Sequence, residues 1–373
     1  MPTGWGGRMA SLVRIAGSGP AGLTAAINLA RAGYRVEVCE RRPDSGRRFA
    51  GDIQGLENWS VAGDILDHLR EMGLVINFDC TPCSTLTVTN GARVWRFACD
   101  RPAFYLVKRG AAPGCLDQGL KAQALALGVE IRYNTPLAAA AADIVASGPR
   151  FRQLFAIDKG IVFRTAMADI ACGLVNDDAA FRGYSYLLVM NGYGCMCTVL
   201  FDTFANISQC LTETRRIFAD LLPLDIQEPR PVGGVGSFAL PSLFQRGNSR
   251  FVGEAAGLQD LLWGFGMRSA ITSGYLAARS IIEGSDYGRL AHCFFDRRLK
   301  ASVVNRFLWE RFGRSSYASI IDRIDRARDP LAFLHSFHNL NWLQRLVYPL
   351  AVRFCRQRYG HLWNVPTDGH DAL

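Results

Sequence analysis

A glycine-rich turn near the start of the chain constrains the fold more than any other feature. Residues 12–16 form an apolar run typical of a buried parallel strand, and Gly17, Gly19 and Gly22 follow it in G-x-G-x-x-G spacing. In such a turn the first glycine permits a tight bend, and the second lets backbone approach a pyrophosphate. The third lets the next helix pack closely on the strand. The segment therefore predicts the first strand and helix of a Rossmann-type unit.

An acidic residue at the end of the next strand completes this unit. A helix is expected over 21–32 and a strand over 35–39, and Glu40 follows the strand directly. Glu40 lies 18 residues past Gly22, where a carboxylate can accept hydrogen bonds from ribose hydroxyls. Arg41, beside it, would also suit the 2′-phosphate of NADP. The unit predicts that a dinucleotide binds here.

A second glycine-rich segment, about 230 residues later, predicts a grip on the other end of the same ligand. A strand expected over 250–252 breaks at Gly253, and Glu254 could then accept a hydrogen bond from a ribityl hydroxyl. The loop 264–266 leads into a helix expected over 267–283, whose start offers free N–H groups and the positive end of the helix dipole. Such a helix start would stabilise the negative charge of a reduced flavin. Because FAD is long enough to need a grip at each end, the two segments together favour FAD.

With these motifs the chain resembles the FAD-dependent oxidoreductases of the p-hydroxybenzoate hydroxylase-like superfamily, and within them the geranylgeranyl reductase-like branch. The resemblance covers roughly residues 11–290, and the superfamily is indicated by GSGPAG at 17–22, Glu40, GEAAG at 253–257 and GFGM at 264–267. The branch is indicated by AGDIQGLE at 50–57, similar to a loop of these reductases, and by GYSYLL at 183–188, similar to a signature near their substrate cavity.

The resemblance implies an α/β fold: a Rossmann-type FAD-binding domain, an inserted antiparallel-sheet substrate domain and a helical C-terminal segment. Asn90-Gly91 and Asn191-Gly192, each between alternating apolar runs, predict two hairpins of that antiparallel sheet. The expected domain ranges are 11–80, 103–150 and 245–285 for the FAD-binding domain, 81–102 and 151–244 for the substrate domain, and 286–373 for the basic C-terminal segment.

The resemblance also implies a set of site residues. Arg109, expected at the entrance of a helix over 115–127, stands where members hold the FAD phosphates or the flavin face. Tyr184, Tyr186 and Trp263 are the candidates for lining the substrate cavity, whereas no catalytic residue and no metal ligands can be assigned. The expected cofactor-binding residues are Gly17, Gly19, Pro20, Ala21, Gly22, Glu40, Arg41, Ala50, Gly51, Arg109, Gly253, Glu254, Gly264, Gly266 and Met267.

Departures from the branch leave the chemistry open. Ala50 stands where these reductases have a cysteine, and Tyr186, Leu188 and Val189 replace the later residues of the second signature. We expect reduction of a double bond in an apolar, isoprenoid-like substrate at flavin N5, with NAD(P)H or a reduced carrier as the electron donor. A flavin monooxygenase is the alternative. A halogenase fits less well, since the lysine and the tryptophan-rich segment of such relatives are missing. A flavin-binding interaction protein without turnover is a third possibility.

Two cysteines in C-x-x-C spacing, Cys80 and Cys83, raise the question of a redox dithiol. The chain has eleven cysteines, scattered without a disulfide framework, which favours reduced thiols and a cytoplasmic location. No apolar run approaches the roughly 20 residues of a bilayer span, and residues 1–10 lack the apolar core of a signal peptide. We interpret Cys80 and Cys83 as structural thiols.

The C-terminal segment is strongly basic. Residues 289–361 hold fourteen Arg and Lys against five Asp and Glu, an excess that equals the net charge of +9. Within 341–358, apolar residues recur at helical spacing among four arginines, the pattern of a basic amphipathic helix. Docking of the apolar stripe on the protein's own core is favoured, with peripheral membrane contact or an acidic partner left open. Nucleic acid is not expected, because no recognition module accompanies the charge.

Overall fold

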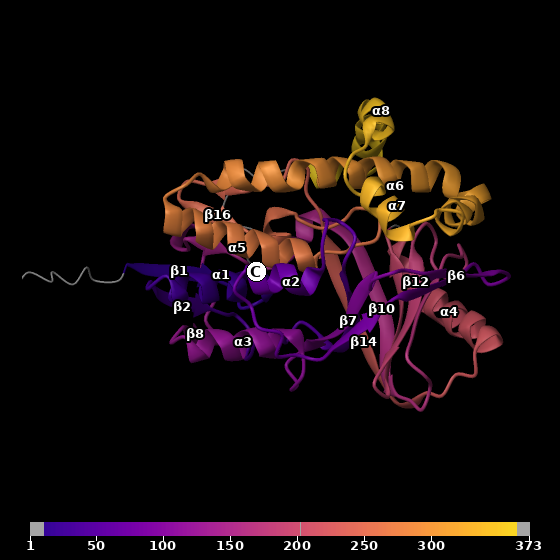
Figure 1. Cartoon of the computed structure of the whole chain (residues 1–373), viewed down its shortest axis with the longest axis horizontal. Coiled ribbons are helices and arrows are strands. Elements are labelled where there is room, and N and C mark those ends of the chain that lie inside the picture. The colour runs from indigo at the N-terminus through magenta and orange to yellow at the C-terminus, as the bar shows by residue number, and fades with distance from the viewer. Residues whose placement is uncertain (1–10, 202, 364–373) are drawn as a thin grey trace, which may run out of the picture.

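The predicted Rossmann-type sheet is present at one end of the molecule (Figure 1). The structure, a computed structural model, describes residues 11–201 and 203–363, apart from the side chains of 314–316. Except for the antiparallel edge strand β15, neighbouring strands of this six-stranded sheet are parallel. Its strands are, in spatial order, β15 (Gln245–Arg246), β16 (Ser249–Phe251), β9 (Ile144–Val145), β1 (Leu12–Ala16), β2 (Arg35–Cys39) and β8 (Glu130–Arg132).

The helices that follow these strands cover the sheet. Helix α1 (Pro20–Arg31) packs against α3 (Leu116–Ala126) and α5 (Met267–Glu283), which lie on either side of it in Figure 1. The buried side chains of α1, such as Leu23 and Ile27, join the main hydrophobic core. Burial of such aliphatic side chains stabilises the fold by about 1.5–3 kcal/mol each.

The sheet of the expected substrate domain has seven strands, antiparallel except for the parallel pair β5 and β11, and both predicted hairpins are confirmed as β5–β6 and β12–β13. Helix α4 (Ile207–Leu221) packs against its strands β10 and β13. In spatial order the strands are β14 (Gln227–Ser237), β10 (Leu154–Arg164), β13 (Tyr193–Leu200), β12 (Tyr184–Met190), β11 (Ile170–Leu174), β5 (Thr85–Thr89) and β6 (Val94–Ala98).

A small third sheet lies between the other two in Figure 1, and it corrects two local expectations. Its strands are β3 (Ala50–Glu57), β7 (Phe104–Gly110) and β4 (Cys80–Cys83), and the short helix α2 (Ile65–Glu71) follows β3. The segment expected to resemble a loop is thus an eight-residue strand, β3. Arg109 lies within β7, not at the entrance of α3, because the ladder between β3 and β7 continues to Gly110.

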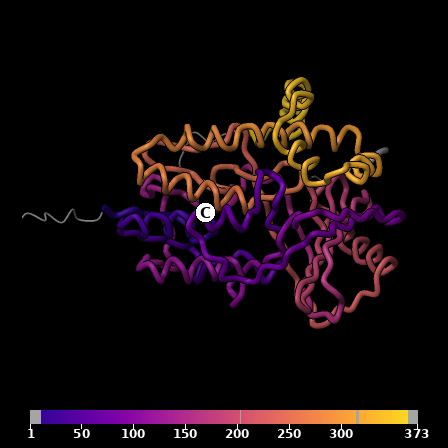
Figure 2. Tube along the Cα trace, viewed as in Figure 1, coloured from indigo at the N-terminus to yellow at the C-terminus, as the bar shows by residue number. Residues whose placement is uncertain are grey.

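The chain after residue 286 is helical. Helix α6 (Tyr287–Asp325) runs along the top of the molecule in Figures 1 and 2, and α7 (Pro330–Phe337) and α8 (Trp342–Arg358) follow it. Residues 364–373 of the expected C-terminal segment, and residues 1–10, lie outside the described residues. No helix of the described part of the chain is long and apolar enough to cross a membrane. The 3-10 helices are η1 (Ala139–Ala141), η2 (Phe151–Gln153), η3 (Phe204–Asn206), η4 (Gly253–Ala256) and η5 (Gly360–Trp363).

Candidate functional site

A cavity of about 730 Å³ lies where the three sheets meet. It reaches the carboxyl ends of β1 and β2, the place where open α/β sheets bind ligands. At one end, here called the dinucleotide end, the lining comes from 16–21, 39–49 and 146–149 and is rich in glycine and arginine. At the other, the apolar end, aromatic and aliphatic side chains from the seven-stranded sheet, from the small third sheet and from α6 and α7 line it. Its size is within the range of small-molecule and cofactor sites.

The three glycines of the first motif have distinct roles. A Cβ on Gly17 would lie 2.3 Å from the Ala146 carbonyl oxygen, and one on Gly22 would lie 2.0 Å from the Gly17 oxygen. A Cβ on Gly19, by contrast, would meet no protein atom within 4 Å. Gly19 faces the cavity and is the N-cap of α1, whose first turn carries no acidic residue. The first and third glycines therefore allow tight packing, while the second leaves room for an anionic ligand at a helix N-terminus.

Glu40 is held beside this glycine turn by hydrogen bonds to its carboxylate. Its carboxylate accepts hydrogen bonds from the Ser18 backbone N–H at 2.8 Å, from the Ser18 hydroxyl at 3.0 Å and from the Arg42 backbone N–H at 2.9 Å. Glu40 also lines the cavity. These bonds fix a carboxylate beside the glycine turn, where a ribose could meet it.

Two ion pairs border the dinucleotide end, one buried and one half-buried. Arg109 donates two hydrogen bonds of 2.9 Å to the Asp117 carboxylate, and both side chains are more than nine-tenths buried. Arg48 pairs with Glu254, which also accepts a bond from the Ser237 backbone N–H. Burial lowers the pKa of Arg48, but its attraction to Glu254 outweighs this effect, and the net shift is upward. The Glu254 carboxylate is therefore already engaged by protein groups, in addition to any ribityl hydroxyl.

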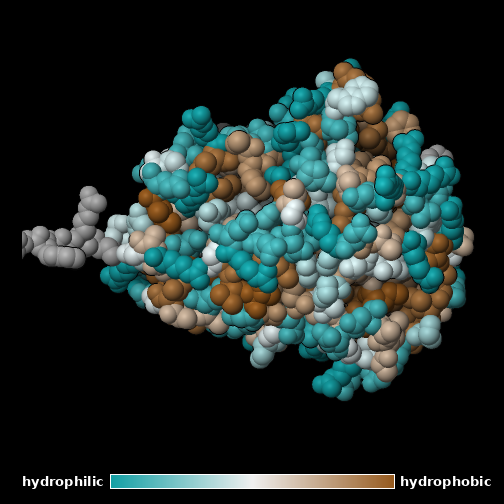
Figure 3. All heavy atoms as spheres, in the orientation of Figure 1, coloured by the Kyte–Doolittle hydropathy of each residue, from teal (hydrophilic) through white to brown (hydrophobic). Residues whose placement is uncertain are grey.

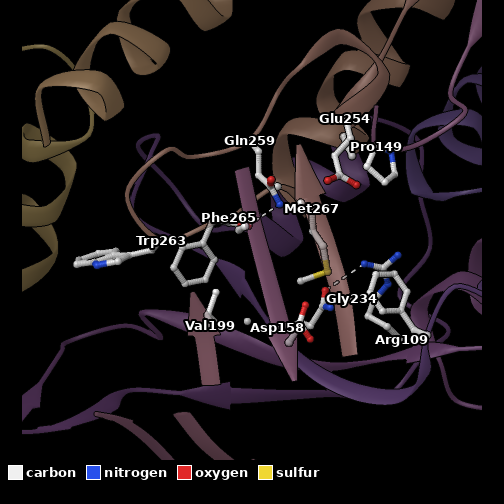
Figure 4. A pocket seen from close by; sticks show the side chains of 18 of the residues that line it. Arg109, Pro149, Asp158, Val199, Gly234, Glu254, Gln259, Trp263, Phe265 and Met267 are labelled. Atoms are coloured by element: carbon white, nitrogen blue, oxygen red, sulfur yellow. Dashed lines mark hydrogen bonds between the residues drawn. The ribbon is translucent and has the colours of Figure 1, made fainter. Parts of the chain in front are cut away.

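The second glycine segment forms a turn over the middle of the cavity. Gly264 is in the left-handed region, with φ of +75°, and an added Cβ would meet nothing within 4 Å. Gln259 donates to the Gly264 carbonyl oxygen at 3.0 Å and holds this turn. Figure 4 shows Met267, the first residue of α5, pointing into the same cavity as Glu254. The start of α5 is thus open to a ligand, as the sequence predicts.

The structure brings most of the predicted site residues together around one cavity. Three predicted cofactor-binding residues do not line it: Gly22 packs under the first turn, and Ala50 and Gly51 lie at the start of β3. The residues that do line it are Gly17, Gly19, Pro20, Ala21, Glu40, Arg41, Arg109, Gly253, Glu254, Gly264, Gly266 and Met267, together with the substrate-cavity candidates Tyr184, Tyr186 and Trp263.

At the apolar end the aromatic candidates are in contact with one another. The Tyr184 hydroxyl donates to the Trp263 carbonyl oxygen, and the rings of Tyr184 and Tyr186 lie 6.2 Å apart. Trp59 meets the Phe265 ring edge-on at 5.1 Å. Burial raises the pKa of both tyrosines well above the ordinary value, so their hydroxyls are neutral. This end can hold an apolar molecule with few polar partners.

The C-terminal helices complete the apolar end. The sequence analysis did not predict this contribution. Trp309, Ile320 and Ile324 of α6 and Leu334 of α7 all line the cavity. The signal was present, because Ile320, Ile321 and Ile324 recur at helical spacing within a highly charged stretch. The basic C-terminal segment thus also forms a wall of the cavity.

An acid at the border between the two ends was also missed. Asp158 of β10 lines the cavity, and its side chain points into it in Figure 4. Burial, and then the nearby Asp52 carboxylate, raise the pKa of Asp158 to about 6 from an ordinary 3.8. A carboxyl with such a pKa can hold a proton near neutral pH and release it to a ligand. No motif marks it, because the shift arises from burial in the folded chain.

The C-x-x-C pair does not have the geometry of a dithiol. Cys80 and Cys83 are at the two ends of β4, and residues three apart in a strand point to opposite faces. Burial raises the pKa of the Cys80 thiol to about 12 and that of Cys83 to about 11. Both are therefore protonated and unreactive, in agreement with a structural role.

Comparisons with known proteins agree with this architecture. Residues 15–55 match the family described as NAD(P)-binding Rossmann-like domain. A search among curated proteins found no match. A solved structure of a geranylgeranyl bacteriochlorophyll reductase-like protein from Thermoplasma acidophilum is similar, with a TM-score of 0.71 and 17% identity over 93% of this chain and 98% of that one. The chain therefore shares the fold of this reductase-like protein.

Two further solved structures with a similar fold are of a brominase and an oxygenase. A flavin-dependent brominase has a TM-score of 0.60 and 15% identity, with 94% of this chain and 99% of that one covered. A 2-methyl-3-hydroxypyridine-5-carboxylic acid oxygenase has a TM-score of 0.55 and 16% identity, with 88% and 96% covered. At such identities the similarity shows the fold alone, so the reaction must be inferred from the cavity.

Proposed function

We propose that the chain is an FAD-dependent oxidoreductase that reduces a carbon–carbon double bond of an apolar, isoprenoid-like substrate. The observation that carries this proposal is the single cavity that joins a dinucleotide end to an apolar end. A cofactor bound along the glycine turns would have its ring system where the two ends meet, next to any apolar molecule in the other end.

The residues at the dinucleotide end fit FAD. The open space at Gly19 and the start of α1 would take the pyrophosphate, and Glu40 would accept hydrogen bonds from the ribose of the adenosine. The N–H groups at Gly266 and Met267, at the start of α5, would face the flavin ring system. The cavity-lining arginines complement the phosphate charges.

The remaining chemistry divides between the cofactor and one acid. Bound FAD in its reduced state supplies a hydride to one carbon of the double bond. Asp158 would donate a proton to the other carbon, which completes the addition of two hydrogens, and would regain a proton from solvent. Tyr184, Tyr186 and Trp263 would hold the substrate chain and exclude water.

The electron donor would be NAD(P)H or a reduced electron carrier. The chain has a single dinucleotide fingerprint, and the proposed FAD occupies it. A nicotinamide cofactor would therefore bind transiently, or a carrier protein would deliver electrons to the flavin.

Oxygen chemistry is the second candidate, and it is favoured by the similarity to an oxygenase and a brominase. In that case the reduced flavin would react with oxygen and hydroxylate the substrate, or, as the weaker variant, halogenate it. A flavin-binding protein without turnover remains a third candidate. The apolar end of the cavity is common to all three.

One experiment separates these candidates. The purified protein is reduced anaerobically by light and then mixed with either a prenyl substrate or oxygen while the flavin spectrum is followed. Reoxidation by the prenyl compound without oxygen, with one saturated bond formed per flavin, supports the reductase. A stable hydroperoxide spectrum with stoichiometric oxygenation would replace it with the monooxygenase. No reoxidation by any prenyl compound, with slow reaction with oxygen, would indicate a protein without turnover.

A further inference from the structure

Helix α8 exposes an apolar ridge to solvent. Trp342, Leu343, Leu346 and Leu350 are 69%, 54%, 70% and 62% exposed. At about 100° per residue these four positions fall within an arc of about 100° on one side of the helix. Single exposed apolar residues are normal on a protein surface, but a contiguous group of four on one helix face marks an interaction site. We call these four residues the α8 ridge.

The α8 ridge is not the face that holds the helix on the protein. Gln344, Ala351 and Cys355 are buried on the opposite side. The Gln344 side chain donates to the Asn305 amide oxygen of α6 and to the Phe337 carbonyl oxygen of α7, both at 2.7 Å. The sequence-based expectation that the apolar stripe docks on the core is therefore correct only for its inner members. The outermost members face away from the protein.

The charged side chains of α8 itself are all positive. Arg345, Arg353 and Arg356 are exposed, and the helix has no Asp or Glu between Trp342 and Arg358. Figure 3 shows brown and near-white spheres beside teal ones at the tip of the molecule where α8 lies in Figure 1. A partner for this face must offer both an apolar layer and negative charge. The surface of an anionic membrane offers both.

We propose that the α8 ridge docks the protein on an anionic lipid surface, with Trp342 at the level of the headgroups and the leucines among the acyl chains. Tryptophan is enriched at that level of the bilayer. A second copy of the chain fits less well, because a two-fold contact through the ridge would place the arginines of both copies near one another. The proposal concerns binding alone and does not depend on the reaction in the cavity.

The position of α8 places this contact near the apolar end of the cavity. Helix α8 begins shortly after α7, with Asn341 as its N-cap, and it is hydrogen-bonded to α6. Helices α6 and α7 both line the apolar end of the cavity. Because the α8 ridge faces away from α6, a membrane bound there would lie one helix away from the wall of that end. If the substrate is an isoprenoid, this contact brings the enzyme to the layer in which the substrate dissolves.

The test is co-sedimentation of the full chain with vesicles of phosphatidylcholine alone or mixed with phosphatidylglycerol. Two variants are compared with the wild type: Trp342→Gln/Leu346→Gln/Leu350→Gln, which removes the ridge, and Arg345→Gln/Arg353→Gln/Arg356→Gln, which removes the charge. The ridge variant should lower the partition coefficient at least tenfold on anionic vesicles. The charge variant should lower it about fivefold per arginine at low salt. Because the Debye length is about 10 Å at 0.1 M, added salt should weaken the wild type and hardly affect the charge variant.

A matched control removes an equal number of exposed apolar residues elsewhere. Val75, Leu125 and Leu127 lie at or near α3, on the side of the molecule opposite α8 in Figure 1, and their replacement by Gln should leave binding unchanged. All of these positions are exposed, so folding should persist, and a normal near-ultraviolet circular dichroism spectrum verifies it. Equal pelleting of wild type and ridge variant would overturn the proposal. So would a dimer in light scattering without lipid that the ridge variant abolishes, since the ridge would then bind a second copy.

Discussion

At the dinucleotide end of the cavity the chain presents backbone groups and charges from short contiguous segments, whereas at the apolar end it presents side chains from widely separated elements. Gly19 and Glu40 belong to one strand–helix–strand unit, and Gly253 and Met267 to a second segment. Trp59, Tyr184 and Trp309, by contrast, come from a loop after β3, from β12 and from α6.

The two ends should therefore differ in how well they tolerate amino-acid substitutions. A pyrophosphate site depends on the absence of side chains and on the direction of N–H groups, so one added side chain blocks it. An apolar wall depends on the summed contact of many side chains, so one replacement weakens binding without abolishing it. A reductase-like protein, a brominase and an oxygenase have solved structures of similar fold.

The largest effect is expected from Gly19→Val. The new side chain would point into open cavity, where an added Cβ meets no protein atom within 4 Å, so the fold should persist while the pyrophosphate is excluded. We expect colourless protein with less than about a tenth of the wild-type flavin content, measured by absorbance after denaturation. Gly360→Val, also with no atom within 4 Å of the added Cβ but far along the chain, is the control and should stay yellow. Normal flavin content in Gly19→Val would refute the cofactor assignment.

A smaller effect is expected from Ile324→Asn at the apolar end. The side chain lines the cavity from α6, and a polar amide there would lose part of the apolar contact with a substrate. We expect kcat/KM for a prenyl substrate to fall about tenfold, since losing the burial of one aliphatic side chain costs about 1.5–3 kcal/mol at most. The flavin spectrum and flavin content should not change. If flavin content falls as far as activity, the two ends are not separable and the comparison fails.

Asp158→Asn should change how the stability of the flavin-free protein depends on pH. The pKa of Asp158 is raised to about 6 from 3.8, so between these values the unfolded chain loses its proton first. Wild-type stability should therefore fall as pH rises from about 4 to about 6 and then level off, by on the order of 2 kcal/mol. The Asn variant should show a smaller fall, because only the contribution of Asp158 is lost while Asp52 and Asp260, whose pKa values burial also raises, still contribute. Asp220→Asn, at an exposed position of α4, should keep the full fall. Parallel urea-unfolding curves for all three proteins across this range would show that Asp158 is not buried as described.

The sequence by itself determined the dinucleotide end and the order of the elements. Strand 12–16, the helix after it and Glu40 could be placed because the signal is local: each residue acts through its own backbone or its immediate neighbours. The same holds for the hairpins at Asn90-Gly91 and Asn191-Gly192, where turn geometry alone decides the pairing. The start of α5 at Met267 was predictable for the same reason.

Only the tertiary structure decided the apolar end, the acid and the outer face of the last helix. Ile324 lines the cavity because α6 crosses a sheet formed more than a hundred residues earlier, and no local pattern encodes that contact. Asp158 has a raised pKa because burial and a carboxylate from another sheet surround it. In α8 the sequence gives an apolar stripe, but the packing of Gln344 and Cys355 on α6 decides which part of the stripe faces solvent. Contacts between distant segments depend on the whole fold, because each is set by how all the layers pack together.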